Sequence, residues 1–161
     1  MALPAQFIQL SGGGGKTYSA VGDKYTVLAS GDQTAGAYLL MEAVVPPGGG
    51  PPPHFHTREE EAFYVLEGEI TFTIDDRTIV GTPGTFAQIP RETPHAFKNC
   101  SELPSRMLIL CTPAGFESFL AEFGTELPSR DATPIPPSKE EIEKLLKAAP
   151  KYGIMMLPPK G

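Results

Sequence analysis

Three histidines and one glutamate are the residues of this sequence whose types and spacing could do chemistry. His54 and His56 stand two apart in the stretch PPPHFHTREEE. Residues two apart on a β-strand face the same side, so both imidazoles can point at one place. A reversal of chain direction in TREE would bring Glu61, on the next strand, to that place. His95, the third histidine of the chain, follows a proline-containing turn and could supply a third nitrogen. Imidazole and carboxylate groups together suit a divalent transition metal.

The same stretch also has a plainer interpretation. A histidine pair with this spacing is common by chance, and a run of glutamates such as residues 59–61 usually covers a solvated face. The wider spacing favours a site, because all three histidines fall into place together with Glu61 and the flanking glycines.

Short β-strands joined by tight turns are expected to position these residues. The 161 residues include 17 glycines and 18 prolines, without a collagen-like period. Strands are predicted to recur every eight to twelve residues, which is typical of a sandwich or barrel. The predicted strands lie at 24–30, 36–45, two within 62–75 that break near Gly68, two within 77–90, one at 95–99 and one at 105–113. The glycine-rich segment up to about residue 22 is expected to be irregular.

Two helices are predicted in the C-terminal part. Residues 114–124 place four apolar side chains on one stripe and end at a glycine. A second helix starts at Ser138, which has capping-box spacing to Glu141. We therefore predict a single domain over residues 1–161, with an all-β barrel at about 22–113 and a helical extension at about 114–161 that packs outside it.

Composition excludes several classes of function. The net charge of −6 offers no basic face to nucleic acid, and no apolar run approaches the roughly 20 residues that cross a bilayer. GGGGKT at 12–17 resembles part of a phosphate-binding loop, but the required earlier glycine is replaced by Leu10. No secretory signal is evident, and Cys100 and Cys111 form no disulfide framework, which predicts a cytoplasmic protein with reduced thiols.

The glycine, histidine, glutamate and asparagine spacing resembles that of the cupin superfamily. The first motif of that family matches Gly48, His54, His56, Glu61 and Gly68, and the second matches Gly84, Pro90, His95 and Asn99. The resemblance implies a double-stranded β-helix, or jelly-roll barrel, usually as a homodimer. It also implies that His54, His56, His95 and Glu61 bind one divalent transition metal (iron, manganese, nickel, copper, cobalt or zinc).

Two details of the motifs give further expectations. Only Glu61 fits the spacing on both sides, so Glu59 and Glu60 are expected to be solvated. Glu92 stands where the family usually has glycine. A positive φ there would cost on the order of 1 kcal/mol, and would affect the turn but not the ligand.

Within the superfamily, residues 51–72 and the end of the chain are most similar to the quercetin 2,3-dioxygenase-like group. That likeness implies a flavonol or other polyphenol or enol-type substrate that binds the metal beside dioxygen, with Glu61 also acting as a base. Four protein ligands at a six-coordinate metal leave two positions open. Phe63 and Phe97 lie two residues from Glu61 and His95, so they face inward, either as substrate-pocket residues or as plain barrel core.

Two other functions remain open on the sequence. One is a metal-dependent isomerase or lyase that acts on a small polar molecule, and the other is a non-catalytic protein that binds a small ligand, because one barrel hosts many functions. Few charged residues besides Glu61 occupy predicted inward positions, which favours an apolar substrate.

Overall fold

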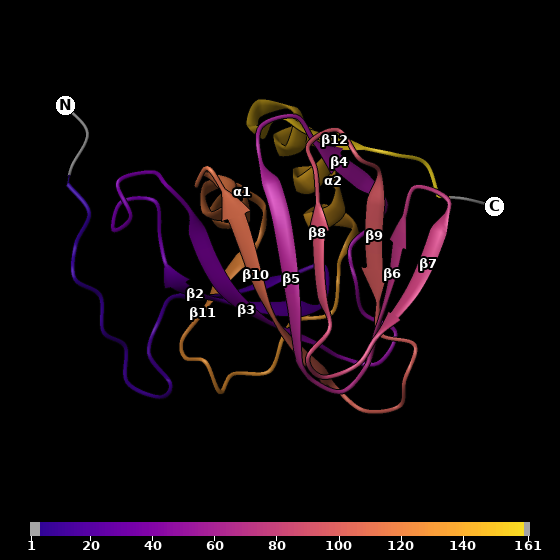
Figure 1. Ribbon diagram of the computed structural model, residues 1–161, viewed down its shortest axis with the longest axis horizontal. Helices are drawn as coiled ribbons and strands as arrows, with labels where there is room; N and C mark the ends of the chain where they lie inside the picture. The colour runs from indigo at the N-terminus through magenta and orange to yellow at the C-terminus, as the bar shows by residue number, and fades with distance from the viewer. Residues whose placement is uncertain (1–3, 160–161) are drawn as a thin grey trace.

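The computed structural model describes residues 4–159, which form two antiparallel β-sheets that pack face to face (Figure 1). The larger sheet has the strand order β11 (Thr125–Leu127), β1 (Thr17–Ala20), β2 (Asp23–Ala29), β3 (Leu39–Val45), β10 (Ser105–Thr112), β5 (Glu60–Glu67) and β8 (Phe86–Ile89). The smaller sheet has the order β12 (Ile154–Met156), β4 (His54–His56), β9 (His95–Lys98), β6 (Ile70–Ile74) and β7 (Arg77–Gly81). The predicted all-β jelly-roll barrel is confirmed.

Alternation of side chains along the strands builds the core between the sheets. On β5, Phe63 and Val65 are buried, whereas Tyr64 between them is 43% exposed. Ile70 and Phe72 of β6 face them from the smaller sheet and are also buried. This period of two follows from the pleat of a β-strand, and it leaves the inner surface of the barrel almost entirely apolar.

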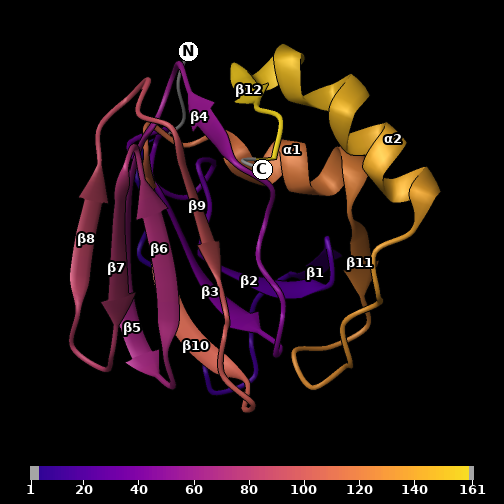
Figure 2. The same cartoon turned by 90° about the vertical axis from the view of Figure 1, so that its right-hand side faces the viewer.

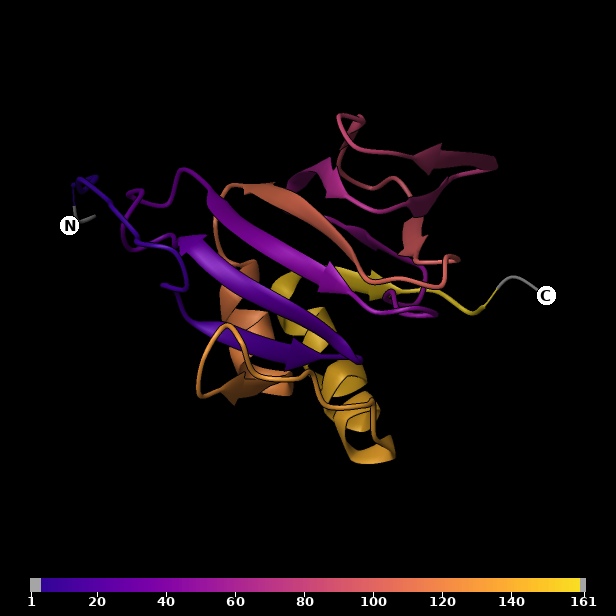
Figure 3. The same cartoon turned by 90° about the horizontal axis from the view of Figure 1, so that it is seen from below.

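The helices cover one side of the barrel, as the sequence predicted. They are α1 (Phe116–Phe123), α2 (Lys139–Ala148) and a short 3₁₀-helix, η1 (Ala149–Tyr152). The Ser138 side chain accepts a hydrogen bond from the Glu141 amide (3.1 Å), which caps α2. Figure 2 shows α1 and α2 packed together beside the strands. In Figure 3, α2 lies on the opposite side of the molecule from the pink strands β6 to β8.

Two expectations about the ends of the barrel are wrong. Residues Thr17–Ala20, expected to be irregular, form β1, which pairs with β2 and with β11. The C-terminal part contributes strands as well as helices, since Thr125–Leu127 pairs with β1 and Ile154–Met156 pairs with β4. Strands of three or four residues are too short to show a clear alternation in the sequence. Whether they form therefore depends on the strands with which they pair in the fold.

None of the helices in residues 4–159 is long and apolar enough to cross a membrane.

Candidate metal centre

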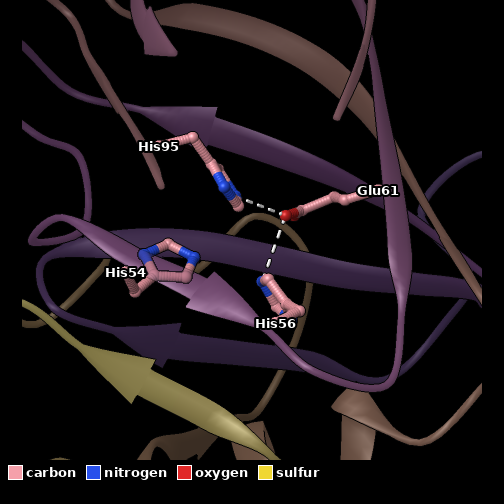
Figure 4. Close-up of side chains that lie close together, drawn as sticks. All are labelled: His54, His56, Glu61 and His95. Atoms are coloured by element: carbon pink, nitrogen blue, oxygen red, sulfur yellow. Dashed lines mark hydrogen bonds and ion pairs between the residues drawn. The ribbon is translucent and has the colours of Figure 1, made fainter. Parts of the chain in front are cut away.

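Three strands from the two sheets bring the four predicted ligands together. β4 carries His54 and His56 two residues apart on one face, and β9 pairs with it so that His54 stands opposite His95. Glu61 arrives from β5 of the larger sheet after the chain reverses at residues 57–59. All four side chains are buried, and one ligand atom from each lies within 4.8 Å of the others (Figure 4). These four residues are called the metal-ligand cluster below.

Each histidine of the cluster is oriented by a hydrogen bond on its outer nitrogen. Nδ1 of His54 donates to the Pro52 carbonyl (2.8 Å), and Nδ1 of His95 donates to the Thr93 carbonyl (2.8 Å). Nδ1 of His56 donates to a carboxylate oxygen of Glu59 (3.1 Å). Because these partners can only accept, the proton of each neutral imidazole lies on Nδ1, and Nε2 presents a lone pair to the centre.

The inner atoms of the cluster form a set of ligand atoms that suits a cation. Oε2 of Glu61 lies 2.9 Å from Nε2 of His95 and 3.2 Å from Nε2 of His56. The contact with His56 is close enough for an ion pair but is not aligned as a hydrogen bond, so this buried Nε2 has no hydrogen-bond partner among the described residues. Three imidazole nitrogens and one carboxylate that converge on one point fit a divalent transition metal, which would replace any proton on the inner nitrogens.

Burial and charge shift the pKa values of these groups in opposite directions. Burial, helped by the nearby His95, lowers the pKa of His54 to about 4. Burial acts in the same direction on His56, but the Glu61 and Glu59 carboxylates outweigh it and raise that pKa to about 9. Burial opposes ionisation of Glu61, yet contact with His56 and His95 holds its pKa below its ordinary value. A proton on His56 therefore competes with a metal, and metal binding is expected to tighten as pH rises.

The expectation that Glu59 is solvated is wrong. Its side chain is 4% exposed and its carboxylate holds His56 in place, whereas the Glu60 side chain is 42% exposed, as expected. The turn after β4 folds Glu59 back under His56, three residues earlier. Glu59 lies two residues from Glu61, but it precedes the first residue of β5, so strand alternation does not fix the side to which it points.

The turn at Glu92 has a positive φ, the conformation that was expected to be costly for a residue other than glycine. Glu92 has a φ of 64°, in the left-handed region that favours glycine. Its amide donates to the His56 carbonyl (2.7 Å), so the turn before β9 is tied to β4. The departure from glycine strains this turn and leaves His95 within the cluster.

A small apolar cavity adjoins the cluster. Its volume is about 40 Å³, room for roughly three water molecules. The polar side chains among its lining residues are Tyr25, His54 and Glu61. Phe97 lines it, whereas Phe63 packs in the core against Phe72, Phe97 and the His95 ring. Sequence reasoning missed Tyr25 and the wall from the C-terminal part, which consists of Phe116, Phe119, Leu120 and Phe123 of α1 with residues of α2 and β12.

The family comparison agrees with the fold and the cluster. The pattern described as "Cupin domain" matches residues 41–111, which contain all four cluster residues. Residues 41–111 form a cupin domain. The helices and the strands β1, β2, β11 and β12 lie outside the match; β11, β1 and β2 extend the larger sheet beyond β3, and β12 forms an edge of the smaller sheet.

Related proteins share part of this chain's sequence. Quercetin 2,3-dioxygenase of Bacillus subtilis (strain 168) is 27% identical over 100 residues, which cover 62% of this chain and only 29% of that protein. Polyketide synthase CurC of Streptomyces cyaneus is 29% identical over 122 residues, 74% of this chain and 79% of that protein.

Solved structures share the fold of this chain. An RmlC-like cupin from Shewanella frigidimarina superposes with a TM-score of 0.61 at 18% identity, over 71% of this chain and 96% of its own. A protein described as a predicted oxalate decarboxylase from Thermotoga maritima gives a TM-score of 0.60 at 17% identity, over 67% and 99% of the two chains. At these identities the likeness establishes the fold alone.

Proposed function

We propose that this cupin is a metal-dependent dioxygenase that acts on a flavonol or another polyphenol or enol-type compound. One observation carries the proposal: His54 and Glu61 of the metal-ligand cluster face a cavity whose other lining is apolar except for Tyr25. Such a cavity suits a substrate with an oxygen at the cluster and an apolar body in the barrel. The similarity to quercetin 2,3-dioxygenase over 100 residues supports this substrate class.

The residues of the site have separate roles in this proposal. His54, His56, His95 and Glu61 would hold one divalent transition metal. The metal, when bound, supplies a Lewis acid that lowers the pKa of a coordinated substrate hydroxyl. Glu61 is ionised at neutral pH because His56 and His95 hold its pKa low, and its carboxylate faces the cavity, where it can accept the hydroxyl proton. The aromatic side chains of α1 keep water out of the same space.

The cavity volume favours a second candidate function. About 40 Å³ is much smaller than the roughly 300–1,000 Å³ of typical ligand pockets, so a flavonol requires the wall of α1 and β12 to move outward. A molecule of a few non-hydrogen atoms would need less movement. We therefore keep a metal-dependent isomerase or lyase acting on a small molecule as the alternative.

Metal analysis and oxygen uptake separate the two candidates. The protein is purified without added metal, its metal content is measured by elemental analysis, and oxygen uptake is followed with a panel of flavonols. The dioxygenase proposal expects one transition metal per chain and uptake with at least one flavonol. Bound metal without uptake rejects the dioxygenase and leaves the isomerase or lyase.

Replacement of a ligand tests the cluster itself. His56→Ala removes one imidazole, so we expect the purified variant to lose most of its metal. Phe55→Ala is the matched control, since Phe55 is the adjacent residue of β4 and alternation places it on the other face. Full metal content in His56→Ala with an unchanged melting temperature would reject the assignment.

A further inference from the structure

Tyr25 is the cavity-lining polar residue that the metal-ligand cluster does not use. It lies on β2 of the larger sheet, and its side chain is 5% exposed. It lines the same cavity as His54 and Glu61. A substrate bound at the cluster would therefore place part of its apolar body beside the Tyr25 side chain.

A buried carboxylate holds the Tyr25 hydroxyl in place. The hydroxyl donates to Oδ2 of Asp23 at 3.1 Å, and Asp23 is fully buried. Oδ1 of Asp23 lies against Gly49 and makes no well-aligned hydrogen bond among the described residues, although the neighbouring Gly50 amide lowers the pKa of this carboxyl. Together with Nε2 of His56, this Oδ1 is one of two buried side-chain atoms without such a bond in the part of the chain that the structure describes. A carboxylate buried beside a tyrosine, with one oxygen that lacks a well-aligned hydrogen bond, is costly for stability alone, and such groups often serve function.

Tyr25 and Asp23 form a hydrogen-bonded pair, and the protonation state of this pair decides which group of a ligand the Tyr25 hydroxyl can contact. Burial, and then the charge of Asp23, raises the pKa of Tyr25 well above its ordinary value, so its hydroxyl keeps its proton. Burial raises the pKa of Asp23 to about 7, so this carboxyl exists in both forms near neutral pH. With ionised Asp23, Tyr25 donates to Asp23 and its oxygen can accept from a ligand. With protonated Asp23, the carboxyl can donate to Tyr25, which can then donate to a ligand.

We propose that Tyr25, positioned by Asp23, is a second polar contact for the substrate and selects a hydroxyl group on its apolar body, apart from the oxygens at the metal-ligand cluster. A hydroxyl both donates and accepts, so it satisfies Tyr25 in either form of the pair, whereas a carbonyl or an ether satisfies one form only. This inference rests on the proposed function, because it takes the substrate to be bound at the cluster.

Binding of two flavonols tests the contact without turnover. Protein loaded with zinc, which has no redox chemistry, is titrated anaerobically with quercetin and with 3-hydroxyflavone, and the Kd follows from the flavonol absorbance. Both probes carry the chelating hydroxyl and carbonyl, but only quercetin carries further hydroxyls. We expect the wild-type protein to prefer quercetin by roughly tenfold, the value of about one hydrogen bond.

Two single substitutions assign this preference to the pair. Tyr25→Phe is expected to reduce the preference to within about twofold and to leave the Kd of 3-hydroxyflavone unchanged. Tyr18→Phe is the matched control, because Tyr18 pairs directly with Tyr25 across β1 and β2 and is also buried, but does not line the cavity. Zinc content and melting temperature are measured for each variant.

Replacements of Asp23 separate positioning from packing. Asp23→Asn keeps an oxygen that accepts from the Tyr25 hydroxyl, so most of the preference should remain. Asp23→Ala removes the acceptor and should abolish the preference as Tyr25→Phe does, with the Kd of 3-hydroxyflavone unchanged.

The outcomes distinguish the inference from the function on which it rests. A wild-type protein that binds both flavonols equally, or a Tyr25→Phe variant that keeps the preference, overturns the role of Tyr25 and leaves the substrate class standing. A wild-type protein that binds zinc but neither flavonol overturns the substrate class and this inference together.

Discussion

The Glu59 carboxylate sits behind His56 and contacts no other member of the cluster by hydrogen bond. It fixes the tautomer of His56 and increases the basicity of Nε2 toward a metal. We predict that Glu59→Gln weakens metal binding by roughly 10- to 100-fold, measured by competition with a chelator of known affinity.

Glu60→Gln is the control for this prediction. It removes the same charge one residue away, from a side chain that is half exposed, and should leave metal affinity unchanged. Equal effects of the two substitutions would assign the loss to overall charge instead of to the contact with His56.

Asp23 makes stability depend on pH. The pKa of Asp23 is about 7 in the folded protein and 3.8 for a free side chain, so between these values the folded state holds more protons than the unfolded state. The contribution of Asp23 to stability is therefore greatest below pH 4 and is lost as pH rises through 7. The change is on the order of 4 kcal/mol.

Unfolding of the metal-free protein in urea at several pH values tests this prediction. Relative to the wild type, Asp23→Asn should gain stability between pH 4 and pH 8, because it removes the buried charge. A stability difference between the two proteins that is the same at both pH values would contradict the shifted pKa.

At the scale of elements, the glycine loop before β4 positions the metal-ligand strand. Gly50 has a φ of 131°, and a Cβ there would lie 1.9 Å from the Phe97 carbonyl oxygen of β9. Gly48 also has a positive φ (78°), but a Cβ there would meet open space. We predict that Gly50→Ala destabilises the protein by roughly 3 kcal/mol or more, from backbone strain plus the clash.

Gly48→Ala isolates the cost of the positive φ alone. We expect it to lower the free energy of unfolding by about 1 kcal/mol in the same urea experiment. If the two alanine variants are equally stable, close packing of this loop on β9 does not hold β4 in place.

At the scale of the whole molecule, one edge of the larger sheet carries exposed apolar side chains. Phe86 of the edge strand β8 is 62% exposed and stands opposite Tyr64, which is 43% exposed. Apolar side chains on an open sheet edge favour association. We predict a homodimer that uses this edge, and we predict that Phe86→Glu shifts it toward monomer in size-exclusion chromatography with light scattering.

Leu103→Glu is the matched control for the dimer. Leu103 is 73% exposed in the loop between β9 and β10 and belongs to neither β5 nor β8, so its replacement should leave the particle mass unchanged. A monomeric wild-type protein would reject the dimer.

The sequence by itself determined the strands of the barrel core and the four residues of the metal-ligand cluster. The reason is local: alternation, turn-forming residues and the spacing on β4 are properties of neighbouring residues, and the cluster is tied to two short motifs. The strands β1, β11 and β12, the inward turn of Glu59, and the meeting of Tyr25 and α1 at the cavity were decided by the tertiary structure. These features depend on contacts between residues far apart in the chain, and no local pattern encodes such contacts.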